Sequence, residues 1–551
     1  MHRPWLEHYD YWVPPHLTYP ERPLWEILDA TCVEIPDAPA TAFLGATLTF
    51  RAIKTQADWL AAAFLRLGLA KGERVGIMLP NCPQYIVTAF AAMRCGAIVV
   101  NVNPALAPRE VRQIAVDSGM RVLVTLHALV TTAIDLKSAS TLEHVIITSL
   151  EEYSAAQTPT PRVDGTLAFA ELVTGEGRPP VTRVPIHADD VAVLQYTGGT
   201  TGSPKGAMLT HRNIFANVVQ TETFTYRSRV RGEGRYMIVL PYAHVFGFTV
   251  GLMKGTWVGA LQILIPKFDV EGVLEAVRDF QPTYFPAVPT VWIALLSHPR
   301  ITEYGLDRVR IFTSGGAPCP PDVLDRFERT VGRSLFEGFG LSEASPVTHS
   351  TPLLGERKIG TIGLPMPDTD LKIVDAEFGT RTCATGEAGE LCISGPQIMK
   401  GYWNRPEDTA IALRTHDDGR VWLHTGDIAT IDADGYTRIV QRKKDMIIVD
   451  GFNVYPSEVE AVLCQHADVR LAAAIGQQDG YHGEVVRAYV TLRDGSTTTP
   501  DALIAHCAQN LAPYKVPRTI DIRSTLPMTN LGKVLYRVLR DEAASPAEAR
   551  G

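Results

Sequence analysis

Apolar and polar positions alternate in two rhythms over the first quarter of the chain. Residues 48–69 show a short strand pattern and then apolar side chains at helical spacing, whereas 74–79 form a continuous apolar run of the kind that a buried strand has. Helical spacing returns over 84–95, and a strand pattern returns over 97–101. This alternation of strands and helices predicts a mostly parallel α/β sheet.

The same rhythm returns over residues 235–340, and the pattern changes after about residue 440, where a basic and then apolar segment leads into a smaller α+β region. A chain of 551 residues also exceeds a single core. We therefore predict an α/β protein in three parts. These are a large N-terminal region of several subdomains (1–440), a small mobile α+β C-terminal domain (441–540) and a disordered tail (541–551).

Composition narrows the class of protein. Apolar residues make up 46% and charged residues 20% of the chain, and the net charge of −8 argues against nucleic acid as a partner. Eight scattered cysteines without metal-binding spacing suit the reducing cytoplasm, and the first residues lack the apolar core of a signal peptide. The apolar stretch 248–265 is interrupted by Lys254 and three glycines, which favours a buried element over a membrane span. We expect a cytoplasmic protein; peripheral membrane contact, and the choice between monomer and homodimer, stay open.

The most informative stretch is LQYTGGTTGSPKGAMLTHRN, residues 194–213. A strand-like run over 191–196 leads into a loop rich in glycine and hydroxyl residues, and a helix-like segment begins near Thr210. Backbone N–H groups, hydroxyls and an ammonium make an anion cradle, so we predict that the loop binds a polyphosphate. The expected cradle consists of Thr197, Gly198, Gly199, Thr200, Thr201, Gly202, Ser203 and Lys205. Pro204 breaks the Walker spacing, and the flanking strand and helix disfavour the alternative of a plain surface loop.

The loop resembles the phosphate loop of adenylate-forming enzymes, the superfamily of acyl-CoA synthetases, luciferases and peptide-synthetase adenylation domains. Five further segments follow in the order of that family, so that the resemblance extends from about residue 24 to 540. They are LPYAHVFGF (240–248), SGGAP (314–318), EGFGLSE (337–343), WLHTGDI (422–428) and LPMTNLGKVLYR (526–537). The chain is most similar to fatty acyl-CoA ligases, through GTIGLP, MKGYWNRPEDTA and RKKDMIIVDGFNVYPSEVE.

By this resemblance, two of the segments bind the nucleotide and its metal. The turn of Gly315, Gly316 and Ala317 is expected to line one face of the adenine, although a plain tight turn would look the same. Phe339 stands where the family has tyrosine, and it keeps an aromatic face for stacking on the purine but loses a hydroxyl. Glu343 offers an oxygen ligand suited to Mg²⁺ that bridges phosphates. The expected nucleotide-binding set also includes Glu337, Gly338, Gly340 and Ser342, the last of which replaces a threonine of the family.

The resemblance also assigns residues for the acid and the ribose. His244 is expected to form a wall and gate of the acyl pocket, with a core histidine as the alternative. Because no acidic residue stands within 240–251 to pair with an amino group, an uncharged acyl chain is favoured. Asp427 is expected to bind the ribose with Arg442 beside it, and the alternative for Asp427 is a helix cap or a turn residue.

Three residues of the C-terminal part are expected to serve a change of conformation. By resemblance, Lys444 lies at a hinge and Lys533 reaches from the small domain into the active site, although a lone lysine after glycine is usually a solvated surface charge. Rotation about the hinge would withdraw Lys533 and present Gly451 and its neighbours for the thioester stage.

These features together predict an ATP-dependent acid–thiol ligase that uses Mg²⁺. A medium- to long-chain fatty acid would attack ATP to give an acyl-adenylate and pyrophosphate, and CoA would then displace AMP. The expected catalytic residues are Thr197, His244, Glu343 and Lys533. The alternatives are an aryl- or short-chain-acid CoA ligase, an acyl-AMP ligase that feeds a carrier protein, and a nucleotide sensor without catalysis. The lack of an obvious insertion between Glu343 and Gly363 favours CoA as the acceptor.

Overall fold

The computed structural model describes residues 3–175, 177, 179, 184–197, 204–225, 231–449, 452–479, 483–528 and 534–544. The chain divides into two compact units. Unit 1 consists of Met1–Asp370 and Ser394–Leu423, and unit 2 consists of Leu371–Ile393 and His424–Gly551. The predicted class, a large α/β region followed by a smaller C-terminal part, is confirmed. The boundary at 440/441, which concerns the part expected to move, stays a prediction.

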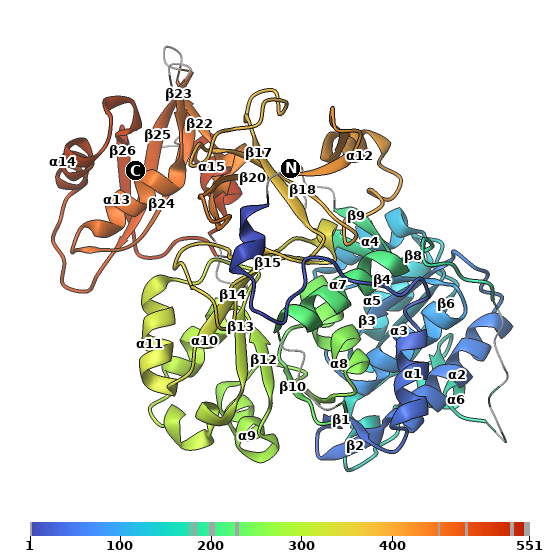
Figure 1. The fold of residues 1–551 in the computed structure, drawn as a ribbon. Helices are drawn as coiled ribbons and strands as arrows, with labels where there is room; N and C mark the ends of the chain where they lie inside the picture. The colour runs from blue at the N-terminus through green and yellow to red at the C-terminus, as the bar shows by residue number, and fades with distance from the viewer. Residues whose placement is uncertain are drawn as a thin grey trace. The chain divides into compact units, whose positions relative to one another are not determined.

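Unit 1 contains a seven-stranded sheet with the order β7-β6-β5-β3-β4-β8-β9 (Figure 1). Its strands are β3 (Arg74–Met78), β4 (Ile98–Asn101), β5 (Val122–Leu126), β6 (His144–Thr148), β7 (Leu167–Ala168), β8 (Val191–Thr197) and β9 (Lys205–Thr210). All neighbours are parallel except β8 and β9, which are antiparallel. The central strands are short apolar runs buried along nearly their whole length, as expected of a parallel sheet with helices on both faces.

A second, nine-stranded sheet of unit 1 has the order β16-β15-β14-β13-β12-β10-β11-β1-β2. Its strands are β1 (Pro39–Phe43), β2 (Ala46–Thr49), β10 (Arg235–Ile238), β11 (Leu261–Leu264), β12 (Tyr284–Ala287), β13 (Ile311–Ser314), β14 (Leu335–Gly340), β15 (Val347–Ser350) and β16 (Leu364–Pro365). The six central strands run parallel to one another; they are β14, β13, β12, β10, β11 and β1. The outer strands β2, β15 and β16 pair antiparallel with their neighbours. Parallel strands bring their carboxyl ends to one edge, where ligands of open α/β sheets bind.

Helices cover the sheets in layers. α2 (Phe50–Arg66) and α3 (Pro83–Arg94) share one apolar core with side chains of both sheets, so they lie between them. α4 (Pro108–Ser118) and α5 (Val130–Lys137) cover the other face of the seven-stranded sheet. α9 (Val270–Phe280), α10 (Pro289–Leu296) and α11 (Pro321–Val331) cover the other face of the nine-stranded sheet, as Figure 1 shows in yellow-green. The remaining helices of unit 1 are α1 (Glu26–Glu34), α6 (Phe169–Leu172), α7 (His211–Thr225), α8 (Lys254–Trp257) and α12 (Pro406–Ala412).

Unit 2 holds the C-terminal elements. β20 (Val421–Ile431) begins in unit 1, where it pairs with β19 (Leu413–Thr415), and it continues into unit 2, where it pairs with β21 (Thr437–Arg442). A further sheet has the order β23-β22-β25-β24, and β26 pairs with β25. The other elements are β17 (Asp370–Val374), β18 (Gly389–Ser394), β22 (Ile447–Val449), β23 (Phe452–Val454), β24 (Val469–Asp479), β25 (Gly483–Leu492), β26 (Thr519–Arg523), α13 (Pro456–Gln465), α14 (Pro500–Asn510) and α15 (Tyr536–Ala544). Because α15 extends to Ala544, the first four residues of the predicted disordered tail are helical, and 545–551 lie outside the described residues.

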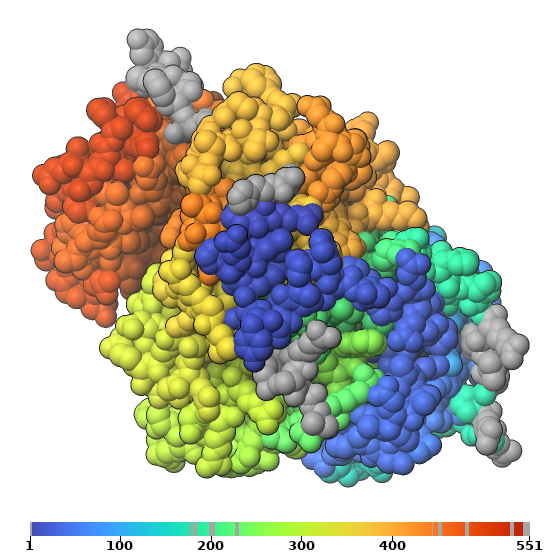
Figure 2. Space-filling model, viewed as in Figure 1, coloured from blue at the N-terminus to red at the C-terminus, as the bar shows by residue number. Residues whose placement is uncertain are grey.

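The N-terminal segment is tied to the distal part of unit 1. Asp10 is buried, and its carboxylate accepts hydrogen bonds from the backbone N–H groups of Leu353, Leu354 and Gly355 at 2.7–2.9 Å. Arg3 forms an ion pair with Asp370 at 2.6 Å. Figure 2 shows this segment in dark blue, spread over the surface of unit 1. The N-terminal segment therefore holds the loop between β15 and β16 and the first residue of β17.

The stretch 248–265 is a buried part of unit 1, as the sequence predicted. It contains a π-helix (Gly247–Met253), α8 and β11, and the glycines and Lys254 that interrupt it lie in or between these elements. Nowhere in the described ranges does a helix have the length and apolar character to cross a bilayer.

Two buried histidines predict acid sensitivity of unit 1. Burial lowers the pKa of His211 to about 4 and that of His349 to about 3. The unfolded chain therefore binds more protons than the folded chain between about pH 6.5 and 4, so stability is complete above this window and is lost as pH falls through it.

Between pH 7 and 4.5, the free energy of unfolding in urea should fall less in His211→Asn than in the wild-type protein. The difference should be on the order of 3 kcal/mol, which corresponds to the pKa shift of this one histidine. The matched control is His187→Asn, which changes an exposed histidine and should leave the wild-type slope. An unchanged slope in His211→Asn would contradict the assignment.

Candidate active site

The predicted phosphate loop connects two antiparallel strands. β8 ends at Thr197 and β9 begins at Lys205, and these two residues face each other in the register. The helix α7 does begin at His211, close to the predicted Thr210, but β9 lies between the loop and this helix. The sequence predicted no strand here, and the structure shows that the residues of β9 pair with β8. The predicted loop residues Gly198, Gly199, Thr200, Thr201, Gly202 and Ser203 lie outside the described residues.

A segment distant in sequence lies along β9. The N–H of Met208 donates to the carbonyl of Gly401, and the N–H of Trp403 donates to the carbonyl of Gly206, both at 2.8 Å. This pairing places Tyr402 beside Lys205, whose Nζ is 5.5 Å from the centre of the tyrosine ring. The MKGYWNRPEDTA segment therefore belongs to the phosphate hairpin, a contact that only the folded chain reveals.

Glu343 lies at the same place. It stands in a single 3-10 turn, Ser342–Ala344, directly after β14, and its carbonyl accepts a hydrogen bond from the N–H of Met399 at 2.8 Å. The hydroxyl of Tyr402 donates to the Oε1 atom of Glu343 at 2.7 Å. The carboxylate is half-buried, and its oxygens suit a hard divalent cation such as Mg²⁺. A cation and a carboxylate thus flank one tyrosine.

Lys205 has a carboxylate partner that the sequence analysis did not single out. Its Nζ lies 2.5 Å from Oδ1 of Asp408 in α12, and both side chains are largely buried. The pair restricts where the ammonium can point. Tyr402 and Asp408 both belong to the MKGYWNRPEDTA segment that supports the family resemblance, and that match was the available signal for a role in the site.

The two glycine-containing segments at the carboxyl ends of β13 and β14 lie against each other. A Cβ on Gly315 would stand 3.0 Å from the ring of Phe246 and 3.3 Å from the carbonyl oxygen of Gly338. Gly316 has φ +78°, a conformation that favours glycine. Gly315, Gly316 and Ala317 therefore share one edge of the sheet with Gly338, Phe339 and Gly340, as the predicted adenine site requires.

Glu337 is unusual in this region because it is a carboxylate in a largely buried position. Burial raises its pKa to about 7, against a single lowering contribution from the N–H of Cys319, which donates to Oε1 at 3.3 Å. It lies in β14 opposite Ser314 of β13. Near neutral pH this carboxyl group is shared between its protonated and ionised forms.

His244 follows β10 at the same edge of the sheet. Its backbone N–H donates to the carbonyl of Pro241 at 3.0 Å, and its Nδ1 accepts from the N–H of Phe246 at 3.2 Å. Because Nδ1 is an acceptor, the neutral ring carries its proton on Nε2. The side chain is exposed, so the core alternative for His244 is wrong.

Within unit 2, Asp427 and Arg442 face each other on β20 and β21. The Nε atom of Arg442 lies 2.9 Å from Oδ1 of Asp427, whose side chain is almost completely buried. The N–H of Asp427 donates to Oγ1 of Thr425 at 3.1 Å, which fixes the turn before the carboxylate. The structure thus places the predicted ribose residue and its predicted arginine side by side.

A buried carboxylate that the sequence analysis missed supports this turn. Glu390 of β18 accepts a hydrogen bond from the N–H of Gly426 at 3.2 Å and from Nζ of Lys443 at 2.9 Å, and it lies 3.2 Å from Nδ1 of His424. Burial disfavours its ionised form, but the His424 and Lys443 contacts outweigh burial and lower the pKa of Glu390 to about 2. A glutamate between two ordinary strand residues carried no signal in the sequence.

The predicted hinge lies between two tethered residues. Lys443 is held by Glu390, and Asp445 forms an ion pair with Arg540 of α15. Lys444 is thus the single residue between two residues that are held by ion pairs. Gly451 and Lys533, the other two predicted residues of this part, lie outside the described residues.

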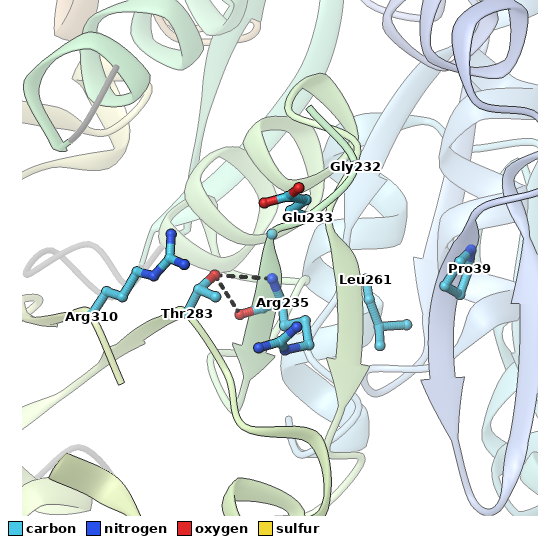
Figure 3. A pocket seen from close by; sticks show the side chains of 8 residues that line it. Pro39, Gly232, Glu233, Arg235, Leu261, Thr283 and Arg310 are labelled. Atoms are coloured by element: carbon cyan, nitrogen blue, oxygen red, sulfur yellow. Dashed lines mark hydrogen bonds between the residues drawn. The ribbon is translucent and has the colours of Figure 1, made fainter. Parts of the chain in front are cut away.

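A surface pocket of about 360 Å³ is found elsewhere in unit 1. Figure 3 shows Arg235, Thr283 and Arg310 on one side of it and Pro39 on the other. These residues begin or directly precede their strands, so the pocket lies at the amino ends of the parallel sheet. The candidate site lies at the opposite, carboxyl edge, where ligands of such sheets bind.

Glycine-lined turns at the carboxyl edge, beside a lysine-bearing hairpin and a half-buried carboxylate, are typical of nucleotide-binding α/β enzymes. The chain belongs to the AMP-binding enzyme family, because the model of that family matches residues 28–403 and the model of the AMP-binding enzyme C-terminal domain matches residues 458–533.

The most similar curated proteins that we compared are full-length relatives. A long-chain-fatty-acid–CoA ligase of Bacillus subtilis (strain 168) is 40% identical over 555 residues, covering 98% of each chain. The long-chain-fatty-acid–CoA ligase of Salmonella typhimurium is 38% identical, covering 98% of this chain and 99% of the relative. Among solved structures, ATP-bound MatB from Rhodopseudomonas palustris superimposes with a TM-score of 0.83 at 27% identity, covering 94% of this chain and 98% of that one.

Proposed function

We propose that the protein is an ATP-dependent fatty acid–CoA ligase that forms acyl-CoA, AMP and pyrophosphate through an acyl-adenylate. The observation that carries the proposal is the grouping of Lys205, Tyr402 and Glu343 at the phosphate hairpin, although they stand far apart in the sequence. The full-length similarity to long-chain-fatty-acid–CoA ligases supports fatty acids of medium to long chain as the substrates.

In the first step, the fatty carboxylate attacks the α-phosphate of ATP. A carboxylate is already ionised at neutral pH, so the chain must align the reactants and neutralise phosphate charge and needs no strong general base. Thr197 and Lys205 flank the loop that would hold the phosphates, and Lys533 would stabilise charge at the reacting centre. His244 would form a wall of the acyl site, two residues before Phe246, whose ring lies against the predicted adenine turn at Gly315.

Mg²⁺ fits the donor set at Glu343. The Tyr402 hydroxyl occupies one side of Oε1 and fixes the direction of the carboxylate, and the half-buried position limits competition from water. When bound, Mg²⁺ would neutralise phosphate charge and orient the phosphate chain.

In the second step, CoA would displace AMP. Asp427 and Arg442 would hold the ribose, and rotation of the small C-terminal domain about Lys444 would exchange Lys533 for the surface around Gly451. We place this reaction in the cytoplasm, because all eight cysteines are free of disulfides and suit a reducing compartment. Contact with a membrane would be peripheral, as a way to collect an apolar acid.

The test is AMP release from a panel of C2–C18 fatty acids and aryl acids, with CoA and with an acyl carrier protein as acceptors. The proposal expects acid-dependent AMP release that peaks at medium to long chains and thioester formation on CoA. A peak at aryl or short acids, or transfer to the carrier protein alone, would favour the corresponding alternative. AMP release that does not depend on any acid would exclude the ligase.

A hinge at Lys444 predicts separable defects in the two steps. Proline fixes φ and prevents backbone rotation, so Lys444→Pro should retain acyl-adenylate formation and reduce thioester formation by on the order of 10²-fold. Each step should be timed separately. Lys444→Ala removes the side chain but keeps the backbone rotation, and it should retain thioester formation. Equal losses of both steps in the proline variant would indicate misfolding or a chemical role.

A further inference from the structure

A row of hydrogen-bonded, buried polar side chains lies beneath the loop that carries His244. Tyr85 of α3, Asn101 at the end of β4 and Gln195 of β8 are 0%, 3% and 4% exposed. The hydroxyl of Tyr85 contacts Oδ1 of Asn101, and Nδ2 of Asn101 donates to Oε1 of Gln195 at 2.9 Å. The last hydrogen bond of this row runs from Nε2 of Gln195 to the carbonyl of Ala243 at 3.1 Å.

The same loop is held from a second side. Asn81 is 3% exposed, and its Nδ2 lies 3.1 Å from the carbonyl oxygens of Ile238 and Leu240. Its Oδ1 accepts the N–H of Tyr242 at 2.8 Å. The backbone from the end of β10 to the residue before His244 is therefore held by the buried side chains of Asn81 and Gln195.

These amides are costly groups to bury in an apolar core. An unpaired buried amide or carbonyl costs on the order of 1–3 kcal/mol, whereas a fully paired network makes a unique and rigid arrangement. Asn101 and Gln195 face each other in the register of β4 and β8. In each amide, both the oxygen and the nitrogen have a hydrogen-bond partner. A leucine would fill the same space without this cost. We therefore attribute the amides to a second role, which is to fix the position of the loop that carries His244.

Gln195 occupies the decisive place in the network. It stands two residues before Thr197, in the strand that leads into the phosphate loop, while its side chain reaches the residue before His244. One side chain thus connects the two segments that must hold the two reactants.

We propose that Gln195 is a positioning residue for the fatty acid: it sets the His244 loop relative to the phosphate hairpin. The inference rests on the proposed function. The backbone of Gln195 pairs with β4 and β9 on either side, so shortening or blunting its side chain leaves the hairpin in place. The carbonyl of Ala243 then loses its donor, and the residue before His244 is no longer tied to β8. The residue before that keeps its contacts, because the Tyr85 hydroxyl still donates to the carbonyl of Tyr242 at 2.9 Å and Asn81 still accepts the N–H of Tyr242.

The consequence is an asymmetric kinetic defect. Gln195→Leu should raise KM for the fatty acid by on the order of tenfold in acid-dependent pyrophosphate exchange, about the effect of losing one buried hydrogen bond. KM for ATP should stay within about twofold of the wild-type value, since the ladder pairs of β8 are unchanged. A role in stability alone would lower the amount of active enzyme and leave both KM values as they were.

Gln195→Glu supplies a second test that does not depend on the folding of the leucine variant. A protonated carboxyl group can donate to the carbonyl of Ala243, whereas an ionised one cannot, and burial raises the pKa of a carboxyl group. The ratio of the variant's activity to the wild-type activity, at limiting fatty acid, should therefore fall as pH rises. A ratio that does not change with pH would overturn the proposal.

Gln84→Leu is the matched control. Gln84 is fully buried in α3, and its Nε2 donates to the carbonyl of Ser149 at 2.8 Å, away from the His244 loop. Its loss should lower thermal stability without a change in KM for the fatty acid. If Gln195→Leu behaves like Gln84→Leu, or if it raises both KM values equally, Gln195 has no positioning role. If the wild-type protein adenylates no fatty acid at all, the proposed function fails and the positioning role fails with it.

Discussion

Lys533→Ala should almost abolish fatty-acid-dependent pyrophosphate exchange while leaving the conversion of supplied acyl-AMP and CoA near the wild-type rate. In our proposal the ammonium is needed only while negative charge builds at the α-phosphate and the carboxylate. Removing one positioned charge of this kind costs on the order of 10²-fold or more in rate. The two half-reactions should be measured separately, together with thermal unfolding.

The control for this experiment is Lys267→Ala, which removes an exposed lysine between β11 and α9. It should change neither half-reaction. Both variants should keep the wild-type melting temperature, as expected if the lysine has a chemical role and no role in packing. If both half-reactions fall equally in well-folded Lys533→Ala, the lysine serves both steps and the alternation of domains is wrong for this chain.

Glu343→Ala should lower the rate of acyl-adenylate formation by about 10²–10³-fold, the usual effect of losing one preorganised electrostatic contact. The proposed metal carboxylate lies at the phosphate hairpin, where Tyr402 orients it. The loss should be greatest at limiting Mg²⁺ and should be partly relieved by a large excess of the ion. The measurement is single-turnover formation of acyl-AMP across a range of Mg²⁺ concentrations.

Two variants separate the charge of Glu343 from its position. Glu343→Gln keeps an acceptor for the Tyr402 hydroxyl but has no charge, so it should be nearly as impaired as the alanine variant. Tyr402→Phe keeps the charge and loses only the orienting hydrogen bond of 2.7 Å, so its defect should be smaller, on the order of tenfold. A fully active Glu343→Gln would show that Mg²⁺ binding does not require the charge of this carboxylate.

Local pattern predicted the elements, whereas most candidate residues were named through the resemblance of their segments to the family. The buried runs of β3 and β4 and the helical spacing of α2 and α3 are periodic over their own length, so the sequence alone predicted them. The glycine-containing turn at 315–317 was found in the same way, because a turn requires particular residues at adjacent positions, whereas 338–340 proved to be the end of the strand β14. No strand was predicted over 205–210, because a short apolar run directly before a helix start fits either structure.

The sequence by itself determined the α/β class and the family, and it named Glu343, Asp427 and Arg442 as candidate site residues. Only the tertiary structure decided that Tyr402 lies between Lys205 and Glu343, that Glu390 accepts the N–H of Gly426 beside Asp427, and that Gln195 reaches the loop of His244. Each of these contacts joins segments tens to hundreds of residues apart. Such contacts form when helices and sheets pack, and a side chain that bonds to a distant backbone carbonyl leaves no periodic signal along the chain.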